Sequence, residues 1–253
     1  MRSSKRLVMV NKSTLIVVML MIVLISSLVS ACSRERPHRT VKDLCGGNKF
    51  GDLYIYENGV YIPFIVVTND YDGKTLLLRK EILELPRKYN TYDSKYEYSS
   101  IDDFLNSEYI KTLTDQNLII LNTDIEITTE SSIGFSGNDT TTIARKIFLL
   151  SYTEIGYNVT VNVAKEGTPL QYFKKNENRI AYLNCEPKEW WLRTPDTYYL
   201  SCVYYIGQNA SIDIGNAFDE KGVRPAFCVS SDALIERRED IVDNSTVYVL
   251  SEQ

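Results

Sequence analysis

Trp190-Trp191-Leu192-Arg193-Thr194-Pro195 is the stretch that decides the fold, and Gly222-Val223-Arg224-Pro225-Ala226-Phe227 resembles it in placing an arginine inside an apolar run. Two adjacent tryptophans followed by Leu-Arg predict a buried strand, because aromatic and aliphatic side chains fit a pleated surface. Thr-Pro ends that strand, and a glycine opens the second motif. We therefore expect the two motifs to form the folding core, with the preceding chain wrapped onto it.

The composition is that of a globular protein with a core, since 44% of the 253 residues are hydrophobic and 24% are charged. The formal net charge is −5, from 28 basic and 33 acidic residues. Four of the basic residues and none of the acidic ones lie in residues 1–31, so the remainder has 24 against 33, or about −9. This balance excludes nucleic acid as a partner, because phosphate binding needs a positive surface.

The single histidine is His38, so the folded part of the chain contains none. This excludes Ser-His-Asp and Cys-His catalysis, histidine acid–base chemistry and histidine metal sites there. The turns at 70–72 and 138–140 lack the spacing of an EF-hand, and Asx turns account for both. We therefore assign no catalytic residue, no metal and no cofactor.

Residues 1–31 have the organisation of a signal peptide, with a basic start, an apolar run from 15 to 28, and small residues before Cys32. The pattern resembles the lipobox of bacterial lipoproteins, which implies that Cys32 is diacylated and becomes the mature N-terminus. The lipid chains would anchor the protein to the cell membrane on its extracytoplasmic side. The alternative is an uncleaved transmembrane anchor, for which the run is short against the ~20 residues of a span.

Three segments follow the signal peptide in our interpretation. Residues 32–44 are a tether that lacks an apolar face and either meets anionic head groups with its basic residues or is simply solvated. Residues 45–230 form one domain. Residues 231–253 are a polar C-terminal extension, in which 247–250 is predicted as an edge strand.

The first half of the domain is predicted to be rich in strands. The runs 53–56 and 60–68 flank Asn58-Gly59 and predict a hairpin, and 75–78 is a third strand. Ser100 with Asp103 predicts the start of a short helix. Further elements are predicted as follows: a second helix from 114, a loop over 122–142, a strand over 146–150, a capping pattern at Ser151 and Glu154, and a helix over 169–176.

A late hairpin is predicted from 198–206 and 210–218, joined by a three-residue loop. Placing Ile206 opposite Ala210 puts alternate residues of both strands on one face, which we expect to face the core. The members of that face are Cys202, Tyr204, Ile212 and Ile214.

Several motifs in chain order resemble those of a bacterial domain family of unknown function, number 6273. They are Phe50-Gly51, Leu76-Leu77-Leu78, Phe104-Leu105-Asn106, residues 146–151, and the motifs at 190–195 and 222–227. The likeness spans roughly residues 48–230, and the motifs at 190–195 and 222–227 are its specific part. That domain is similar to the C-type-lectin-like fold, which also includes formylglycine-generating enzymes. The resemblance implies an α+β fold with a small twisted antiparallel sheet, short helices and long loops. Such a fold hosts adhesion, sugar binding and oxidation, so it does not select a function.

Four residues of the two motifs are assigned structural roles. Arg193 and Arg224 are predicted to be buried and paired with carboxylates or loop carbonyls, because arginine is buried only when paired. An anion clamp is the alternative. Trp190 and Trp191 point to opposite faces of a strand, so we expect at most one of them in the core.

The predicted ligand-binding residues are Asp196, Tyr198, Tyr199 and Asn209, in loops that a rigid sheet carries. The ligand is an unidentified extracellular glycan or protein. The alternative is that the two tyrosines only cover the edge of the sheet. Export to an oxidising space also predicts a disulfide, with Cys202–Cys228 preferred because both lie in late strands of one presumed sheet.

These observations favour a membrane-anchored lipoprotein that acts outside the cytoplasm as a non-catalytic ligand-binding or adhesion module. The alternative is an extracytoplasmic enzyme of formylglycine-generating-like fold that uses cysteines or carboxylates. The missing histidine and the absence of a cysteine motif near Cys202 and Cys228 favour the first function.

Acylation of Cys32 is directly testable. Mass spectrometry of the membrane fraction is expected to find a diacylglyceryl cysteine at this position as the first residue of the mature chain, because the lipobox directs modification before cleavage. Recovery of an intact peptide that begins at Met1 from the mature protein would contradict the assignment.

Overall fold

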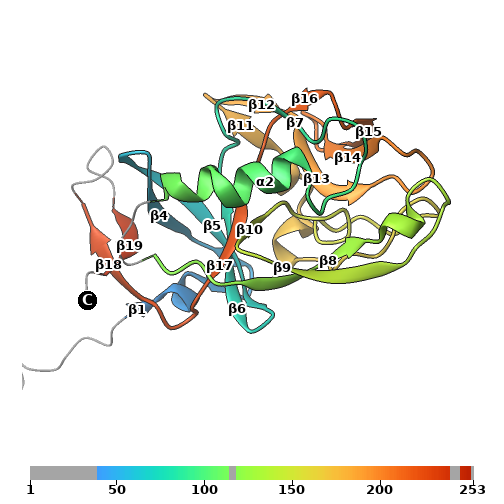
Figure 1. The fold of residues 1–253 in the computed structure, drawn as a ribbon. Coiled ribbons are helices and arrows are strands. Elements are labelled where there is room, and N and C mark those ends of the chain that lie inside the picture. Colours follow the sequence, from blue (N-terminus) through green and yellow to red (C-terminus); the bar gives the residue numbers. More distant parts are fainter. Residues whose placement is uncertain (1–38, 114–117, 240–245, 252–253) are drawn as a thin grey trace, which may run out of the picture. The chain divides into compact units, whose positions relative to one another are not determined.

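The structure is a computed structural model that describes residues 39–113, 118–239 and 246–251. The largest sheet in it is antiparallel and has five strands (Figure 1). The predicted signal peptide and Cys32 lie outside the described residues. In order across the sheet, the strands are β10 (Ile147–Phe148), β17 (Ala226–Val229), β6 (Lys74–Arg79), β5 (Val60–Tyr71) and β4 (Asp52–Glu57).

The predicted hairpin at Asn58-Gly59 is confirmed, with Glu57 paired to Val60 and Asp52 paired to Ile65. Asn58 and Gly59 have φ values of 50° and 87°. Positive φ values at two successive residues are typical of a two-residue hairpin turn, and the twist of such a turn matches that of the two flanking strands.

A second, three-stranded sheet holds β13 (Trp190–Pro195), β14 (Cys202–Ile206) and β15 (Ile212–Asn216). The predicted register is wrong by two residues, because Ile206 pairs with Ile212 and the loop has five residues. Gly207 N–H donates to Ser211 O at 2.8 Å, and Ala210 has a φ of 64°, so the residues between them form a turn. A shift of two leaves the same side chains on each face. The four residues expected to face the core are only partly buried, whereas Val203 on the opposite face is fully buried.

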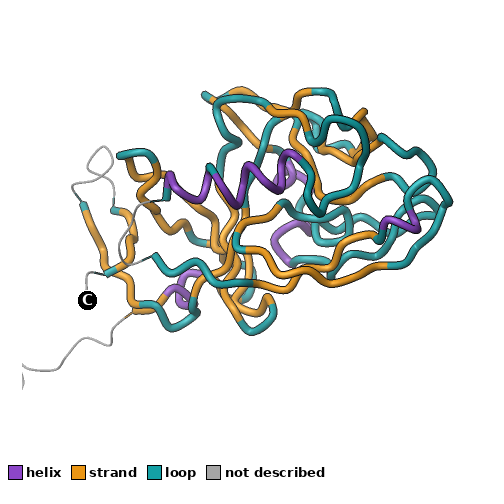
Figure 2. Tube along the Cα trace, viewed as in Figure 1, coloured by secondary structure: helices purple, strands orange, loops and turns teal. Residues whose placement is uncertain are grey.

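The remaining strands make small sheets of two or three strands. They are β1 (Arg39–Thr40) with β18 (Leu234–Arg238) and β19 (Val247–Leu250), β2 (Cys45–Gly46) with β3 (Lys49–Phe50), β7 (Arg87–Lys88) with β16 (Glu220–Lys221), β8 (Thr123–Thr128) with β9 (Thr140–Arg145), and β11 (Ala181–Leu183) with β12 (Glu186–Lys188). The fold is therefore sheet-rich, with long loops that gather at the end farthest from β18 and β19 (Figure 2).

The helices are short. They are α2 (Ser100–Ser107) and the 3-10 helices η1 (Val41–Leu44), η2 (Tyr109–Thr112), η3 (Glu130–Ser132), η4 (Gln171–Lys174) and η5 (Asn176–Arg179). The helix α2 begins one residue earlier than predicted, because Ser99 Oγ accepts from Asp102 N–H at 3.2 Å. No helix within the described ranges has the length and apolar character needed to cross a membrane.

Three predicted elements are corrected. Residues 169–176 form 3-10 turns of η4 and η5 instead of an α-helix, and the loop predicted over 122–142 contains the β8–β9 hairpin. The strand β8 alternates buried Thr123, Ile125 and Ile127 with exposed acidic residues, which is a strand pattern. Residues 114–117 of the predicted second helix lie outside the described residues, and 118–120 are not helical.

The predicted tether and C-terminal extension are partly folded into the domain. The strand β1 pairs with β18, and β18 pairs with β19. Val41 is fully buried, and its N–H donates to Ala233 O at 2.9 Å. The edge strand predicted over 247–250 is confirmed as β19, whereas the two-residue β1 contains no apolar residue that could have indicated a strand. The folded unit begins at Arg39.

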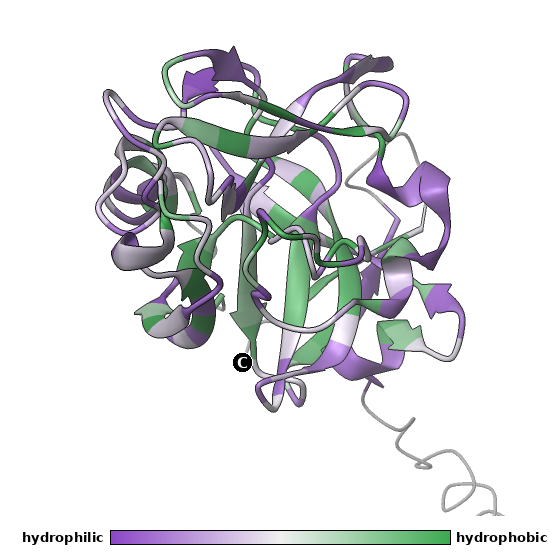
Figure 3. Ribbon diagram, turned by 90° about the vertical axis from the view of Figure 1, so that its right-hand side faces the viewer, coloured by the Kyte–Doolittle hydropathy of each residue, from purple (hydrophilic) through white to green (hydrophobic). Residues whose placement is uncertain are grey.

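The two arginine motifs lie side by side in the interior. Gly222 pairs with Trp190 in a parallel bridge, and Phe227 lies in β17 between β6 and β10 of the largest sheet. The expectation of one core tryptophan is wrong, since Trp190 and Trp191 are both fully buried. Hydrophobic residues concentrate on the strands in the interior (Figure 3). The sheet of β4, β5 and β6 precedes both motifs in the chain, so the core does not come from the motifs alone.

Gly222 is placed where no larger residue fits, so Gly222→Ala tests the packing of the two motifs. A Cβ atom there would lie 2.6 Å from Glu189 O and 2.6 Å from Ile82 Cδ1. We expect the free energy of unfolding, measured by urea denaturation, to fall by about 1–3 kcal/mol.

Gly46→Ala is the matched control, because nothing lies within 4 Å of the corresponding position. Its effect is expected to stay within about 0.5 kcal/mol. Equal stability of the two variants would contradict the close packing at Gly222.

Candidate functional site

Arg193 is fully buried and is surrounded by carboxylates and carbonyls. Its Nη1 and Nη2 donate to the two carboxylate oxygens of Glu154 at 2.7 and 2.9 Å. Nη1 also donates to Leu149 O, and Nε donates to Glu126 O, each at 2.9 Å. Burial lowers the pKa of Arg193, but Glu154, Tyr71 and Glu166 together raise it by more, and the net shift is upward. Arg193 therefore remains charged in the core.

Glu154 meets Arg193 because a local capping pattern holds its backbone. Ser151 N–H donates to Glu154 Oε2 at 2.9 Å, and Glu154 N–H donates to Ser151 Oγ at 3.1 Å. These are the reciprocal bonds of a capping box, although a turn and not a helix follows. Tyr71 adds a hydrogen bond of 2.5 Å to Glu154 Oε1.

Glu166 is the second buried carboxylate near Arg193, with Oε2 3.7 Å from Nε. Its Oε1 accepts from the N–H and the hydroxyl of Thr128, both at 2.7 Å, and Oε2 accepts from the Thr194 hydroxyl at 2.5 Å. Burial raises the pKa of Glu166, while Arg193 and the hydroxyl donors oppose the rise. Glu154 and Glu166 are at most 1% exposed, so a substrate reaches neither while the core is closed.

Arg224 is also buried, but it has no carboxylate partner among the described residues. Nε donates to Arg79 O at 3.0 Å, and Nη2 donates to Lys80 O at 3.2 Å. Nη1 has no hydrogen-bond partner, and the guanidinium lies over the Trp190 ring, 5.2 Å from its centroid. Burial lowers the pKa of Arg224, and Tyr172 opposes that shift.

Tyr198 and Tyr199 lie on a surface that we call the loop face, made by the loops 90–98, 130–137 and 195–201. Backbone hydrogen bonds join these loops. Ser94 N–H donates to Leu200 O at 3.1 Å, and the N–H groups of Gly134 and Ser136 donate to Thr197 O at 2.8 and 2.9 Å. The loops 130–137 and 195–201 form the right-hand end in Figure 1.

Large apolar side chains are exposed on the loop face. Their exposed fractions are 85% for Tyr92 and Tyr98, 80% for Phe135, 64% for Leu200, 57% for Tyr198 and 51% for Tyr199. The Tyr198 and Tyr199 rings contact edge to face, with centroids 4.8 Å apart. Large apolar side chains exposed together on loops that are bonded to one another are typical of an interaction site.

The other two predicted ligand residues have different positions. Asp196 is buried, and its Oδ1 accepts from the N–H groups of Tyr198 and Tyr199, both at 2.9 Å. Its Oδ2 accepts from the Tyr204 hydroxyl at 3.0 Å. Asp196 thus shapes the loop from beneath. Asn209 lies beyond the far end of the five-residue strand β14, roughly 16 Å along the hairpin, so it is not brought together with the tyrosines.

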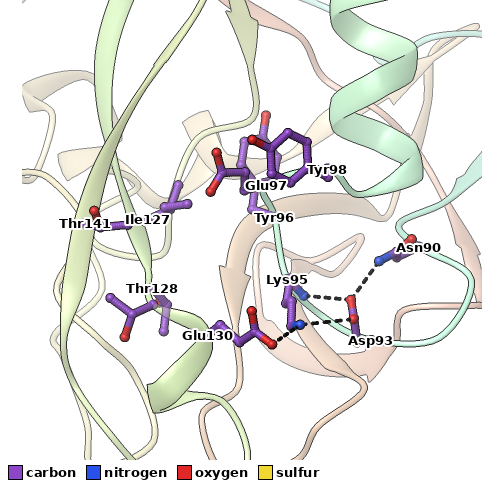
Figure 4. A pocket seen from close by; sticks show the side chains of 11 residues that line it. Asn90, Asp93, Lys95, Tyr96, Glu97, Tyr98, Ile127, Thr128, Glu130 and Thr141 are labelled. Carbon is purple, nitrogen blue, oxygen red and sulfur yellow. Dashed lines mark hydrogen bonds and ion pairs between the residues drawn. The ribbon is translucent and has the colours of Figure 1, made fainter.

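A cavity of about 510 Å³ opens beside these loops, between residues 90–98 and the end of β8 (Figure 4). Its lining contains three carboxylates, from Asp93, Glu97 and Glu130, against one ammonium, from Lys95. Lys95 pairs with Glu130 and lies 3.9 Å from Asp93. The cavity is therefore acidic and offers hydrogen-bond acceptors to a ligand.

Tyr98 lies at the rim of this cavity and has a φ of 64°. Few non-glycine residues adopt this left-handed conformation, and such strain is concentrated at functional sites. Tyr98 N–H donates to Asp102 Oδ2 at 3.2 Å, which holds the strained residue in place.

Sequence reasoning missed the contributions of Tyr92, Phe135 and Leu200 to this face. A signal was present for Phe135, because an aromatic residue between Gly134 and Gly137 in a polar stretch has no neighbouring apolar pattern to bury it. Tyr92 and Leu200 had no such signal, since their exposure depends on how the three loops meet.

The predicted Cys202–Cys228 disulfide is not formed, and all four described cysteines are free. Cys202 lies in β14 and Cys228 in β17, which belong to two different sheets. Burial raises the pKa of the Cys228 thiol to about 12, so it is not a reactive thiolate. Within the described ranges, no group of three or more His, Cys, Asp or Glu residues is arranged to hold a metal ion.

A comparison with protein families finds one match. The family model described as Domain of unknown function (DUF6273) matches residues 72–231, which is more than half of the chain. The matched region includes both arginine motifs and the whole loop face. No curated protein and no solved structure matches the chain.

The buried carboxylates predict a pH dependence of stability. The pKa of Glu166 is raised above 4.5 in the folded protein, so the stability that its bound proton contributes is complete below pH 4.5 and is lost as the pH rises through the folded pKa. Glu166→Gln is neutral at every pH. We expect the urea midpoint of the wild type to fall relative to that of Glu166→Gln as the pH rises above 4.5.

Glu154→Gln is the contrasting variant, because Glu154 neutralises the buried Arg193. It is expected to destabilise the protein by about 3–5 kcal/mol across this pH range. Parallel pH profiles for the wild type and Glu166→Gln would contradict the raised pKa.

Proposed function

The chain belongs to the family of the domain of unknown function DUF6273, and we propose that it is a lipoprotein that binds a partner protein through its loop face without catalysing a reaction. In this proposal Cys32 is acylated and the domain lies outside the cytoplasm at the membrane. The partner is a protein of the extracellular space or of another cell surface.

The observation that carries this proposal is the exposed apolar surface of the loop face. Tyr198, Tyr199 and Phe135 offer large contact areas on loops that backbone hydrogen bonds hold together. Tyrosine has few rotatable bonds, so it loses little entropy when it is immobilised in a complex. Aromatic side chains at the centre of an interface contribute most of its binding energy.

The acidic cavity beside the loop face supports a statement about the partner. Asp93, Glu97 and Glu130 outnumber Lys95, so the edge of the surface is negative. Charge complementarity between partners increases specificity and the association rate. The partner therefore presents an apolar centre with lysine or arginine residues at one edge.

We also propose that the domain has the C-type-lectin-like fold. The resemblance of its motifs to that fold agrees with three features: chain ends that meet through β1, β18 and β19, a helix α2 near the largest sheet, and a late three-stranded sheet from which the loops extend. Lectin-like domains often bind through loops in their later half.

The described chain begins on the side of the folded unit opposite the loop face, which suits a protein that offers this face to a partner. Arg39 in β1 lies at the left of Figure 1, and the loops 130–137 and 195–201 lie at the right. A chain that is anchored before Arg39 has its loop face at the other end of the folded unit.

The alternative is an enzyme of formylglycine-generating-like fold. That chemistry needs reactive cysteines placed close together, whereas Cys202 and Cys228 belong to different sheets and the pKa of the Cys228 thiol is about 12. The buried Glu154 and Glu166 are engaged with Arg193 and with hydroxyl donors. These observations favour the binding function.

Photo-crosslinking tests the loop face in cells that make the full chain. Benzoylphenylalanine in place of Tyr199 is expected to give a discrete protein adduct, and the same group in place of Leu85, which is 70% exposed elsewhere, is expected to give none. Adducts of equal yield at both positions, or at neither, would sink the proposal.

Affinity for the partner identified in this way is expected to fall by about 30-fold or more in the double variant Tyr198→Ala and Tyr199→Ala, because the two lost aromatic contacts together contribute ~2 kcal/mol or more. The matched control is Val60→Ala with Leu85→Ala, which removes two exposed apolar side chains outside the loop face. Thermal melting of each variant verifies that the fold is kept.

A further inference from the structure

A groove on the outer face of the β4–β5 ladder has lysines at one end and tyrosines at the other, and we propose that it binds an anionic glycan chain. We call it the lysine–tyrosine groove. It is distinct from the loop face and goes beyond the proposed function. In Figure 1, β4 lies at the left and the loop face at the right.

The register of the two strands creates the groove. Asp52 pairs with Ile65, Tyr54 with Pro63, and Tyr56 with Tyr61, so alternate residues of both strands share one face. A cavity of about 840 Å³ lies over the Asp52 end, and a cavity of about 590 Å³ lies over Tyr54. Lys80 lines both cavities, so the two adjoin at its side chain, and we call the pair a groove.

The lysine end carries an excess of positive charge. Its lining contains Lys80, Lys174 and Lys175, while Asp52 is the one acidic residue in that lining. Lys80 Nζ lies 2.5 Å from Asp52 Oδ2, whereas Lys174 and Lys175 are exposed and make no ion pair among the described residues. In a chain of net charge −5, two unneutralised lysines side by side in a cavity favour an anionic ligand.

A buried arginine adds to this charge. Arg224 Nη2 donates to the backbone oxygen of Lys80, which lines both cavities, at 3.2 Å. Arg224 has no carboxylate partner within the described chain, and its Nη1 makes no hydrogen bond. An unneutralised guanidinium behind the wall of the cavity reinforces the preference for an anion, because a buried charge is screened only weakly.

The tyrosine end provides flat apolar surfaces. Tyr54, Tyr61, Pro63 and Tyr182 line this part of the groove. Aromatic rings of this kind combine an apolar face with a polar hydroxyl. The C–H face of a sugar ring packs on such a surface, while its hydroxyl groups bond to the phenol oxygens.

Amide side chains complete a set suited to carbohydrate. Asn48, Gln171 and Asn178 line the lysine end, and each amide both donates and accepts hydrogen bonds, as sugar hydroxyls require. Along β4 the lining runs from Asp52 to Tyr54, roughly 7 Å of strand. Nucleic acid is disfavoured, because the chain outside the signal peptide is strongly acidic overall.

Calorimetric titration of the full chain in detergent tests the groove with three probes: trigalacturonic acid, glucose 6-phosphate and the uncharged maltotriose. At least one of the two anionic sugars is expected to bind about ten-fold or more tightly than maltotriose, and its affinity falls as salt is added. Comparison of the two anionic probes identifies carboxylate or phosphate as the charged group. Failure of both to bind, or equal binding of maltotriose, would overturn the proposal.

Lys174→Glu with Lys175→Glu is expected to weaken binding of the anionic sugar by about ten-fold or more, equal to ~1.4 kcal/mol. The control is Lys111→Glu with Lys165→Glu, which changes the net charge equally at exposed lysines outside the groove. Equal loss in both double variants would show a general charge effect and overturn the site. The variant Tyr198→Ala with Tyr199→Ala keeps sugar binding, so failure of the groove and failure of the loop face are distinguishable.

Discussion

The buried ion pair between Arg193 and Glu154 is the interaction on which the rest of the structure depends. Removing two charged groups from water is costly, and the cost is offset only if the geometry is good and the remaining donors are bonded. Here the pair is bidentate, at 2.7 and 2.9 Å, and Leu149 O and Glu126 O accept from the remaining guanidinium groups. One arginine therefore ties β13 to β8 and to the segment that follows β10.

This interior network continues to the loop face. Thr194 donates to Glu166 and accepts from Tyr152 N–H, so the last residues of β13 are held on the side that faces the core. The next turn is organised by Asp196, which accepts from two consecutive N–H groups of the tyrosine loop. Exposed aromatic residues on loops with fixed origins are pre-organised, and pre-organisation reduces the entropy lost on binding.

The domain separates its charges between different surfaces. The cavity beside the loop face has more carboxylates than lysines, and the cavity over Asp52 has more lysines than carboxylates. Because the protein carries a net negative charge, it does not attract anions from a distance. A local excess of lysine therefore attracts only a ligand that enters its cavity. The two ligands that we propose would therefore not compete for the same surface.

Local chemistry in the sequence determined the elements whose signals lie within a few residues of one another. The Asn58-Gly59 turn, the three strands around it and the family motifs at 190–195 and 222–227 are of this kind. Only the tertiary structure decided which carboxylates meet Arg193, because Glu154 and Glu166 are separated from it by 39 and 27 positions along the chain. It also decided that both tryptophans are buried, that β1 meets β18, and that three distant loops form one face. The physical reason is that turn geometry and strand alternation act between neighbours, whereas burial and ion pairing depend on which segments the folded chain brings into contact.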